Sequence, residues 1–311
     1  MKTSADKKKT QSPLDTNNVV AVRRSLDEAS DRDAFETLPV YYTAAGGNPR
    51  AASALASRRK TLTEQTLKHF GVDKKQSDVL DPVWPPVSVF ALPGPRRDVY
   101  DPTTRTRLAS IRNATWSHVD AALSRVHSAQ ARWRSLPGKV RVAIVLEVNE
   151  AIKTNAAELA NLTTLEIGKV PSEATGEIVE VHEVAEAIAE RVGECGGDEA
   201  YPTRVYPSRD PRRKARGWLG EERALPLGVI GKITAFNFPY APFAWGALPA
   251  LAAGNGVIWK PHPSAVLTGM SLTRVCEAVL ARHGFSGLVT GKATPTTSRA
   301  PAYYFRIVTV V

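Results

Sequence analysis

The segment LGVIGKITAF, at residues 227–236, opens the part of the chain whose pattern decides the fold. It is an apolar, β-rich run broken by glycine, and the aromatic and Ala-rich stretch NFPYAPFAWGALPALAAGN follows it at 237–255. A second short apolar run, GVIWKP, stands at 256–261. A strand, a helix that stops at Gly254 and a second strand make a βαβ unit of about 30 residues, which predicts parallel strands joined by a right-handed crossover.

Elements downstream of this unit extend the same sheet. A helix is predicted from about Ser264 to His283, because Ser264 is a good cap residue and Gly284 a good stop. The run GLVTG at 287–291 can supply a third strand. We therefore predict an α/β fold with an incomplete doubly wound domain, preceded by helical and extended N-terminal segments.

Three helices are predicted in the first half of the chain, after a turn at Asp101-Pro102. The first begins at a capping box formed by Ser117 and Asp120. The second and third cover residues 140–152 and 156–165, where apolar residues recur at helical spacing. These helices account for the chain between the turn and the sheet.

The formal net charge of +10 could indicate a nucleic-acid partner, because clustered Lys and Arg bind phosphates. Much of the excess lies in short runs at 7–9, 58–60 and 209–216. The last run is a Pro-flanked loop without interleaved aromatic residues, so we predict a solvated connector and no nucleic-acid partner. The glutamates of the helix predicted at 173–192 are interpreted as one solvated acidic face.

Composition also predicts the domain organisation. Residues 1–60 lack sustained periodicity and are rich in Ser, Thr, Asp and Lys, which predicts a disordered tail. We expect one partial domain over 61–291 and a divergent C-terminal tail over 292–311. No apolar run reaches the roughly 18 to 20 residues of a membrane-spanning helix, so no membrane association is expected.

The two cysteines, Cys195 and Cys276, form no CxxC pair and stand in no His/Cys cluster, so neither a disulfide framework nor a metal site is expected. This usage fits a reducing compartment and predicts a cytoplasmic protein. The run NPRAASALASRRK at 48–60 also resembles part of an organelle transit peptide, which makes a mitochondrial location the alternative.

A nucleotide site is expected at the ends of the parallel strands, where a helix N-terminus offers free N–H groups to a phosphate. The usual glycine fingerprint is absent. Gly254-Asn255-Gly256 stands at the end of a helix, so we interpret it as a helix stop and turn. Residues other than a glycine-rich motif must therefore identify the nucleotide site.

The motifs ITAFNFP at 233–239 and VIWKP at 257–261, with PALAAGN between them at 249–255, resemble those of the aldehyde dehydrogenase superfamily. Within the superfamily, the ITAFNFP motif, together with LEIGK and the Gly-Glu pair at 176–177, looks most like the α-aminoadipic semialdehyde dehydrogenase (antiquitin) branch. The resemblance implies an aldehyde-dehydrogenase-like α/β fold and an oxidoreductase that converts an aldehyde or semialdehyde to a carboxylic acid.

The resemblance extends over most of the chain. It continues back through LEIGK at 165–169 and GEIVEV at 176–181 to the turn at Asp101, and covers about residues 95–291. The predicted domain at 61–291 is therefore a partial aldehyde dehydrogenase domain with an incomplete coenzyme-binding sheet.

Particular residues take roles from the resemblance. Asn237 corresponds to an oxyanion-hole asparagine, a neutral donor worth about 2.7 to 4 kcal/mol in the transition state. Lys260 corresponds to the lysine that hydrogen-bonds the adenosine ribose, and Thr234, Ala235 and Phe236 line the cofactor cleft. By themselves, Asn237 could be a turn residue and Lys260 a solvated strand end.

Pro263 stands where the family often has a glutamate that also binds the ribose. The antiquitin-like branch tolerates a proline there, so the resemblance favours NAD over NADP as the coenzyme. The sequence leaves NADP open, and we expect weak binding of either coenzyme.

The family's mechanism also uses a cysteine nucleophile and a glutamate base. The sequence has no GSTxxG-like, LELGG-like or GQxC-like segment, and we expect Cys195 and Cys276 to be structural. The chain is therefore expected to be the N-terminal part of such an enzyme and not to catalyse the oxidation alone. The alternative is a non-catalytic interaction or regulatory partner of a full-length relative. Missing strands would leave a sheet edge open to such a partner or to homo-oligomers.

Overall fold

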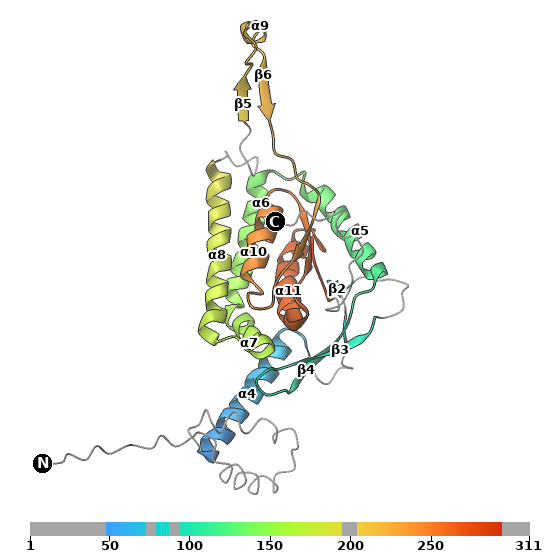
Figure 1. Ribbon diagram of the computed structural model, residues 1–311, viewed down its shortest axis with the longest axis vertical. Helices are drawn as coiled ribbons and strands as arrows, with labels where there is room; N and C mark the ends of the chain where they lie inside the picture. Colours follow the sequence, from blue (N-terminus) through green and yellow to red (C-terminus); the bar gives the residue numbers. More distant parts are fainter. Residues whose placement is uncertain (1–47, 73–78, 82, 87–93, 195–203, 294–311) are drawn as a thin grey trace, which may run out of the picture.

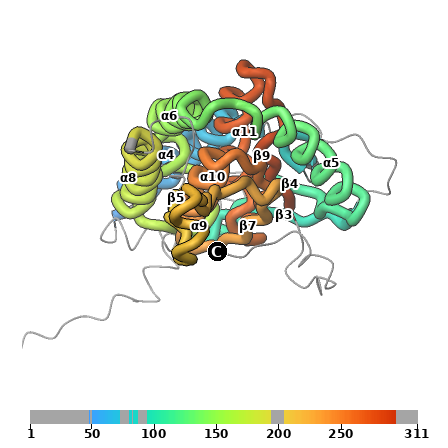
Figure 2. Tube along the Cα trace, turned by 90° about the horizontal axis from the view of Figure 1, so that it is seen from above, coloured from blue at the N-terminus to red at the C-terminus, as the bar shows by residue number. Residues whose placement is uncertain are grey.

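The computed structural model describes residues 48–72, 79–81, 83–86, 94–194 and 204–293, with a four-stranded sheet at its centre (Figure 1). The sheet holds the segments that the sequence pattern singled out. Helices pack on both of its faces, one hairpin shares the core with them, and a second hairpin projects from this body (Figures 1 and 2).

The central sheet has the strand order β2-β9-β8-β7. Strands β7 (Val229–Ile233), β8 (Gly256–Lys260) and β9 (Val289–Lys292) are parallel, and β2 (Val83–Trp84) joins β9 antiparallel. Helix α10 (Ala241–Ala252) connects β7 to β8. The predicted βαβ unit and the predicted third strand are confirmed.

Two helical layers cover the sheet. Helices α10 and α11 (Val266–Arg282) contact one face, and α5 (Trp116–Trp133) contacts the other. Gly256 and Gly291 of the sheet show how close these layers come: a Cβ at Gly256 would meet Val126 of α5 at 2.5 Å, and one at Gly291 would meet Thr273 of α11 at 2.7 Å. Only glycine fits these two positions without a shift of a neighbour.

A second shell of helices packs outside α10 and α11. It consists of α4 (Pro49–His69), α6 (Gly138–Thr154), α7 (Ala156–Ile167) and α8 (Pro171–Glu194). Helices α6 and α8 contact α10, and Figure 1 shows them beside it. Gly168 ends α7 in the left-handed conformation, with φ of +75°. The helices predicted for 140–152, 156–165 and 173–192 are thus confirmed.

Strands β3 (Arg96–Tyr100) and β4 (Arg107–Arg112) form a hairpin, and β1 (Val79–Leu80) runs parallel to β4. The hairpin closes at Asp101, whose carboxylate accepts a hydrogen bond from the Thr103 N–H at 2.8 Å and forms an ion pair with Arg59 at 2.8 Å. The turn predicted at this position is confirmed.

An arm projects from the body at the top of Figure 1. It is the hairpin of β5 (Arg204–Pro207) and β6 (Leu219–Glu222), with the short helix α9 (Pro211–Ala215) between them. The basic run at 209–216 lies there and is exposed, as predicted for a solvated connector. The sequence pattern did not predict β5 and β6. Each strand has four residues, and all of them are exposed, so no alternation of apolar and polar residues marks the strands.

One large core joins the sheet to both helical layers. Its largest fully buried side chains are aromatic, namely Trp84, Trp133, Trp259, Tyr240 and Phe243. Among the described residues, Pro263–Arg282 has the length and composition of a membrane-spanning helix, but 72% of that window is buried. The sequence pattern predicted no such run. The burial explains this stretch as the core helix α11 and the turn before it.

The predicted disordered tail over 1–60 is wrong for its last part. Helix α4 begins at Pro49, after Asn48 accepts the N–H of Arg50 at 3.0 Å as an N-cap. The helix has no strong apolar periodicity, and its contact with the hairpin comes through Arg59, so composition could not reveal it. Residues 1–47 lie outside the described residues.

Two predicted helix starts are also wrong. Helix α5 is capped by Thr115 and His118, whose Nδ1 accepts the Thr115 N–H at 3.3 Å, rather than by Ser117 and Asp120. Helix α11 begins after a 3-10 turn at Pro263–Ala265, so Ser264 is not its cap.

The predicted tail over 292–311 begins too early. Lys292 ends β9, and the carbonyl of Ala293 accepts the N–H of Ala114 at 2.7 Å. Both residues therefore belong to the folded body. Residues 294–311 lie outside the described residues.

Candidate coenzyme and oxyanion site

The residues singled out from the sequence meet at the carboxyl ends of β7 and β8. Ile233 pairs with Lys260 across the two strands, and the Thr234 N–H donates to the Lys260 carbonyl at 3.3 Å. The loops that follow, 234–240 and 261–265, therefore leave the sheet side by side. Ligands of open parallel sheets bind at such strand ends.

The side chain of Thr234 is bonded to the core. It is buried, and its Oγ1 accepts the indole N–H of Trp259 at 3.0 Å. Ala235 and Phe236 are exposed, and the Phe236 ring lies 5.3 Å from the His262 ring. The exposed wall at the strand ends is thus formed by Ala235 and Phe236, while Thr234 fixes the backbone beneath them.

Asn237 is exposed at the start of the loop that leads into α10. Its backbone carbonyl accepts a hydrogen bond from Lys169 Nζ at 2.9 Å, which fixes the main chain. The side-chain amide makes no hydrogen bond to the residues that the structure describes, so it remains able to donate to an oxygen from outside.

Lys169 is held by a buried ion pair with Glu177. The side chains of Lys169 and Glu177 are 7% and 1% exposed, and the Lys169 ammonium also lies 3.8 Å from the centre of the Phe238 ring. Lys169 therefore connects the segment after α7, the acidic helix α8 and the Asn237 loop. The position of Asn237 depends on this contact.

Glu177 also caps helix α10. Its Oε2 accepts the N–H groups of Tyr240 at 2.9 Å and Ala241 at 3.3 Å, which no residue of α10 can bond. A carboxylate at a helix N-terminus is also stabilised by the helix dipole. The interpretation of the α8 glutamates as a solvated face is therefore wrong for Glu177 and confirmed for Glu183 and Glu186, which are exposed.

Glu166 has the corresponding role at α11. The buried carboxylate accepts the N–H groups of Leu267 and Thr268 and the Thr268 hydroxyl, each at 2.7 Å. Burial raises the pKa of Glu166 to about 7, although these hydrogen bonds and the nearby Arg97 act in the opposite direction. The motifs LEIGK and GEIVEV thus supply two buried carboxylates that hold the helices on one face of the sheet.

Lys260 is half-buried at the end of β8, and its ammonium makes no hydrogen bond or ion pair with the described residues. Burial and the charge of Arg97 lower its pKa. Pro263 is buried beside it, and its carbonyl accepts a hydrogen bond from Arg97 Nη1 at 2.6 Å. Arg97 and His262 belong to this site, yet sequence reasoning missed them. No local pattern marks Arg97, which is 166 residues from Pro263.

Cys276 does not serve as a nucleophile. It is fully buried in α11, and burial together with Glu277 raises its pKa to about 12, so it stays a thiol. Its predicted structural role agrees with this position. Cys195 lies outside the described residues, and no cluster of three metal-ligating side chains occurs within the described ranges.

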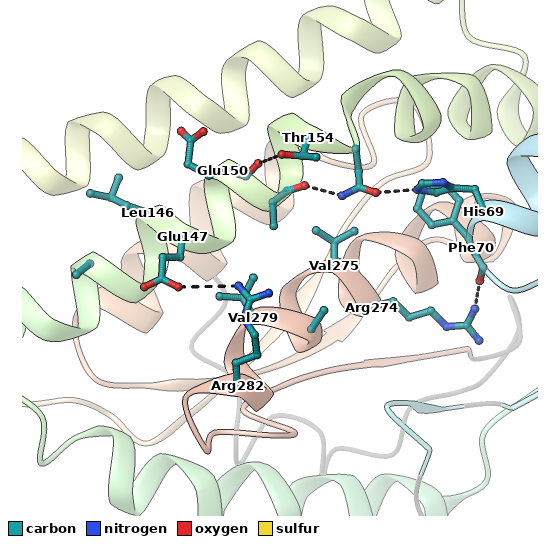
Figure 3. Close-up of a pocket in the computed structure, with 14 residues that line it drawn as sticks. His69, Phe70, Leu146, Glu147, Glu150, Thr154, Arg274, Val275, Val279 and Arg282 are labelled. Atoms are coloured by element: carbon teal, nitrogen blue, oxygen red, sulfur yellow. Dashed lines mark hydrogen bonds and ion pairs between the residues drawn. The ribbon is translucent and has the colours of Figure 1, made fainter.

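A cavity of about 760 Å³ lies elsewhere, between α4, α6 and α11 (Figure 3). Two of its polar side chains are already bonded within the protein: His69 to the Asn155 side chain at 2.7 Å, and Arg274 to the Phe70 carbonyl. None of the residues at the strand ends lines this cavity. It is therefore separate from the candidate site.

Comparison with known proteins agrees with this geometry. Residues 93–300 match the family model described as the aldehyde dehydrogenase family. A putative aldehyde dehydrogenase family 7 member A1 homolog from Caenorhabditis elegans is 30% identical over 214 residues, which cover 69% of this chain and 37% of that protein. Alpha-aminoadipic semialdehyde dehydrogenase from Rattus norvegicus is 31% identical over 190 residues, which cover 61% and 33%. The chain therefore spans about a third of the length of these relatives.

Solved structures show the same fold. A NAD-dependent benzaldehyde dehydrogenase from Corynebacterium glutamicum is 25% identical with a TM-score of 0.56, covering 65% of this chain and 42% of that chain. An NADP-dependent enzyme from E. coli is 25% identical with a TM-score of 0.55, covering 66% and 40%. The predicted fold class and the resemblance to the α-aminoadipic semialdehyde dehydrogenase branch are confirmed.

Proposed function

The chain belongs to the aldehyde dehydrogenase family, and from this premise we propose that its strand ends bind the adenosine half of a nicotinamide coenzyme beside an oxyanion-stabilising Asn237. Enzymes of this family act on aldehydes and depend on NAD or NADP. The reaction to which the site contributes is the oxidation of an aldehyde or semialdehyde to a carboxylic acid. The coenzyme, when bound, accepts the hydride.

The observation that carries this proposal is a pair of polar groups without internal partners. The Asn237 amide and the Lys260 ammonium make no hydrogen bond with the described residues, although the main chain is fixed by hydrogen bonds at both positions, in the loop after β7 and at the end of β8. Lys260 is half-buried, where an unmade hydrogen bond costs free energy, whereas Asn237 is exposed and its amide is open to a ligand. Their availability at one strand edge supports a ligand that supplies the missing partners.

Each group has a distinct part in the proposal. The Asn237 amide donates to the aldehyde oxygen as that oxygen becomes negative, and Lys169 positions it through the backbone carbonyl. Lys260 donates to the oxygens of the adenosine ribose. Ala235 and Phe236 form the exposed wall along which the coenzyme lies. Thr234 and Pro263 act through the backbone and packing rather than by direct contact.

The oxidation needs a cysteine thiolate and a base that we do not assign to these 311 residues. Cys276 is buried and remains a thiol, and Cys195 stands in no matching motif. We therefore propose that the chain binds the coenzyme weakly and does not complete the oxidation alone. The preference for NAD stays a prediction that rests on Pro263.

The edge of the central sheet at strand β7 supports a second candidate function. Strand β7 is the last strand in the order, with no neighbour on its outer side among the described residues. Apolar side chains near it are exposed, including Leu225, Leu227, Ile233 and Phe236. An open strand with exposed apolar residues favours association. The candidate function is that of a non-catalytic partner of a full-length relative or of a second copy.

The test of the first proposal is an NADH assay on the purified 311-residue chain with NAD and a small aldehyde. We expect no aldehyde-dependent rise in NADH absorbance. A steady rise that disappears in the Asn237→Ala variant would show that the chain is a complete catalyst. In the same preparation, sedimentation with and without a full-length family enzyme tests the partner function, and Ile233→Arg should weaken any association.

A further inference from the structure

The arm that projects from the body in Figure 1 is exposed along its whole length. Neither β5 nor β6 contains a buried residue, and α9 between them contains none either. A two-stranded hairpin on its own is only marginally stable in water, because it buries little apolar surface. A surface from outside the chain that covers the arm would therefore stabilise it.

Positive charge is concentrated at the far end of this arm, in residues 208–218, which we call the arm tip. Its single acid is Asp210, and its five basic residues are Arg209, Arg212, Arg213, Lys214 and Arg216. Asp210 forms an ion pair with Arg213 at 3.7 Å, and both side chains are exposed. The two strands behind the arm tip carry equal numbers of acids and bases in 204–207 and 219–223. The excess charge thus stands where the arm reaches farthest from the body.

Two aromatic side chains share one face of the arm. Tyr206 pairs with Gly220, and the ladder continues beyond β5 and β6 because the Ser208 N–H donates to the Trp218 carbonyl at 3.1 Å. Cross-strand partners and alternate residues of a strand point to the same face, so Tyr206 and Trp218 lie on one side. Trp218 is 56% exposed and Tyr206 is 47% exposed. The guanidinium carbon of Arg213 lies 5.2 Å from the Trp218 ring centre, which joins the aromatic face to the basic arm tip.

Basic groups beside exposed Trp and Tyr rings fit the headgroup layer of an anionic bilayer. These rings prefer that layer because each combines an apolar body with a polar N–H or O–H group. Lys and Arg side chains are attracted there by the negative charge of the lipids. A peripheral contact of this kind needs no membrane-spanning segment, and the expectation of no membrane association concerned such segments alone.

A nucleic acid would be attracted by the same charges, but the arm lacks the other features that such binding uses. Single strands are held by aromatic rings interleaved with basic groups, and the run at 209–216 contains no aromatic residue. Helix α9 has only five residues, which is short for a recognition helix in a groove of a duplex. The observations therefore favour a lipid surface.

We propose that the arm binds peripherally to an anionic phospholipid surface. The basic side chains of the arm tip lie at the lipid phosphates, and the rings of Trp218 and Tyr206 lie in the headgroup layer. The inference is independent of the coenzyme site, because that site is built from the loops after β7 and β8 and from no residue of the arm.

Sedimentation of the 311-residue chain with lipid vesicles tests this inference. One set of vesicles contains phosphatidylcholine alone, and in the other set about a third of the lipid is phosphatidylserine. At about 0.1 M salt we expect the anionic vesicles to bind the chain at least roughly a hundredfold more tightly. Most of this binding should be lost at about 0.5 M salt, because the attraction is screened. A duplex oligonucleotide at the same phosphate concentration should not displace the chain.

Neutralisation of the arm tip makes the test specific. The triple variant Arg209→Gln/Arg212→Gln/Lys214→Gln removes three charges whose side chains make no ion pair with the described residues. It should bind the anionic vesicles about a hundredfold more weakly than the unmodified chain. Thermal melting checks that the variant is folded, and its exposed positions predict an unchanged melting temperature.

Matched controls separate the arm from the rest of the surface. Arg50→Gln/Arg58→Gln/Lys68→Gln removes the same charge from exposed positions of α4 and should bind as the unmodified chain does. Trp218→Ala should weaken binding by about tenfold, as expected when about half of a large ring loses its contact. Trp245→Ala removes a ring that is 54% exposed on α10 and should have no effect.

Several results would overturn the proposal. Equal binding to both sets of vesicles, or binding to neither, would show that the arm does not recognise an anionic lipid surface. Equal losses in the arm and α4 variants would mean that overall charge explains the binding. Displacement by the oligonucleotide would identify a nucleic-acid surface instead. An unaffected Trp218→Ala variant would refute the contact with the headgroup layer. The comparison of the two sets of vesicles uses the unmodified chain and does not depend on the folding of a variant.

Discussion

Replacement of Glu177 by glutamine is expected to destabilise the protein more than any other single change on α8. The carboxylate is 1% exposed and neutralises the Lys169 ammonium, which is 7% exposed. It also accepts two N–H groups at the start of α10, at 2.9 Å and 3.3 Å. Removing one partner of a buried ion pair costs about 3 to 5 kcal/mol, because the other charge is left buried.

The reverse change should cost less. In Lys169→Met, the Glu177 carboxylate keeps its two N–H donors and the favourable end of the helix dipole, so we expect a loss of about 2 kcal/mol. The double variant Lys169→Met/Glu177→Gln leaves no unpaired charge. Its loss should therefore fall short of the sum of the two single losses by about 1 to 3 kcal/mol.

Urea unfolding followed by circular dichroism measures these free energies. Glu183→Gln is the matched control, because Glu183 is exposed on the same helix and should change stability by less than about 0.5 kcal/mol. A Glu177→Gln variant as stable as this control, or a double variant with additive losses, would refute the assignment of Glu177 as a buried cap and counter-ion.

Two further predictions concern charge. Lys292 is buried, and burial followed by the charge of Lys260 lowers its pKa to about 8, below the usual value of about 10.4. The unfolded chain therefore binds more protons between these pH values, so stability contributed by this group rises as the pH increases from 8 to about 10.4. Lys292→Met should raise the free energy of unfolding by about 1 to 3 kcal/mol at pH 7 and by less at pH 10, and equal gains at both would contradict the pKa. The basic arm tip should bind nucleic acid only weakly, because no aromatic residue is interleaved in the run at 209–216 and the ring of Trp218 beyond it already contacts Arg213, whose guanidinium carbon lies 5.2 Å from the ring centre. Submicromolar binding of an oligonucleotide at physiological salt, lost when Arg212, Arg213 and Lys214 are neutralised, would show that the arm is a nucleic-acid surface.

The sheet could be predicted from sequence because its signals are local. The apolar runs of β7, β8 and β9 are each four or five residues long, and Gly254 and Gly284 stop the helices between them with φ of +91° and +81°. Glycine adopts a positive φ without steric cost, so the residue type alone indicates where a helix can end. Strand, stop and strand can therefore be identified without any tertiary information.

The caps and the strand-end charges could not be predicted, because they depend on residues far apart in the chain. Glu166 bonds Leu267 across 101 residues, and Glu177 bonds Tyr240 across 63. In the sequence, both glutamates look like ordinary members of a helix. One available signal was the position of Glu166 between the apolar Leu165 and Ile167, which suggests burial.

The roles of Asn237 and Lys260 came from the resemblance and not from their surroundings in the sequence. An asparagine after a strand and a lysine at a strand end are common in loops. The structure adds that neither side-chain group has a hydrogen-bond partner among the described residues, and that the two residues lie at the carboxyl ends of adjacent strands.

Calorimetric titration of the 311-residue chain with NAD and with adenosine 5′-monophosphate tests whether the strand ends hold only the adenosine half of the coenzyme. We expect similar, weak affinities for both, in the millimolar range, because the sequence segments expected around the nicotinamide half have no match in the chain. Lys260→Ala should weaken both by about tenfold or less, as expected for one hydrogen-bonding group. Micromolar binding of NAD that is far tighter than that of the monophosphate would show that the chain holds both halves of the coenzyme, and the proposed half-site would be wrong.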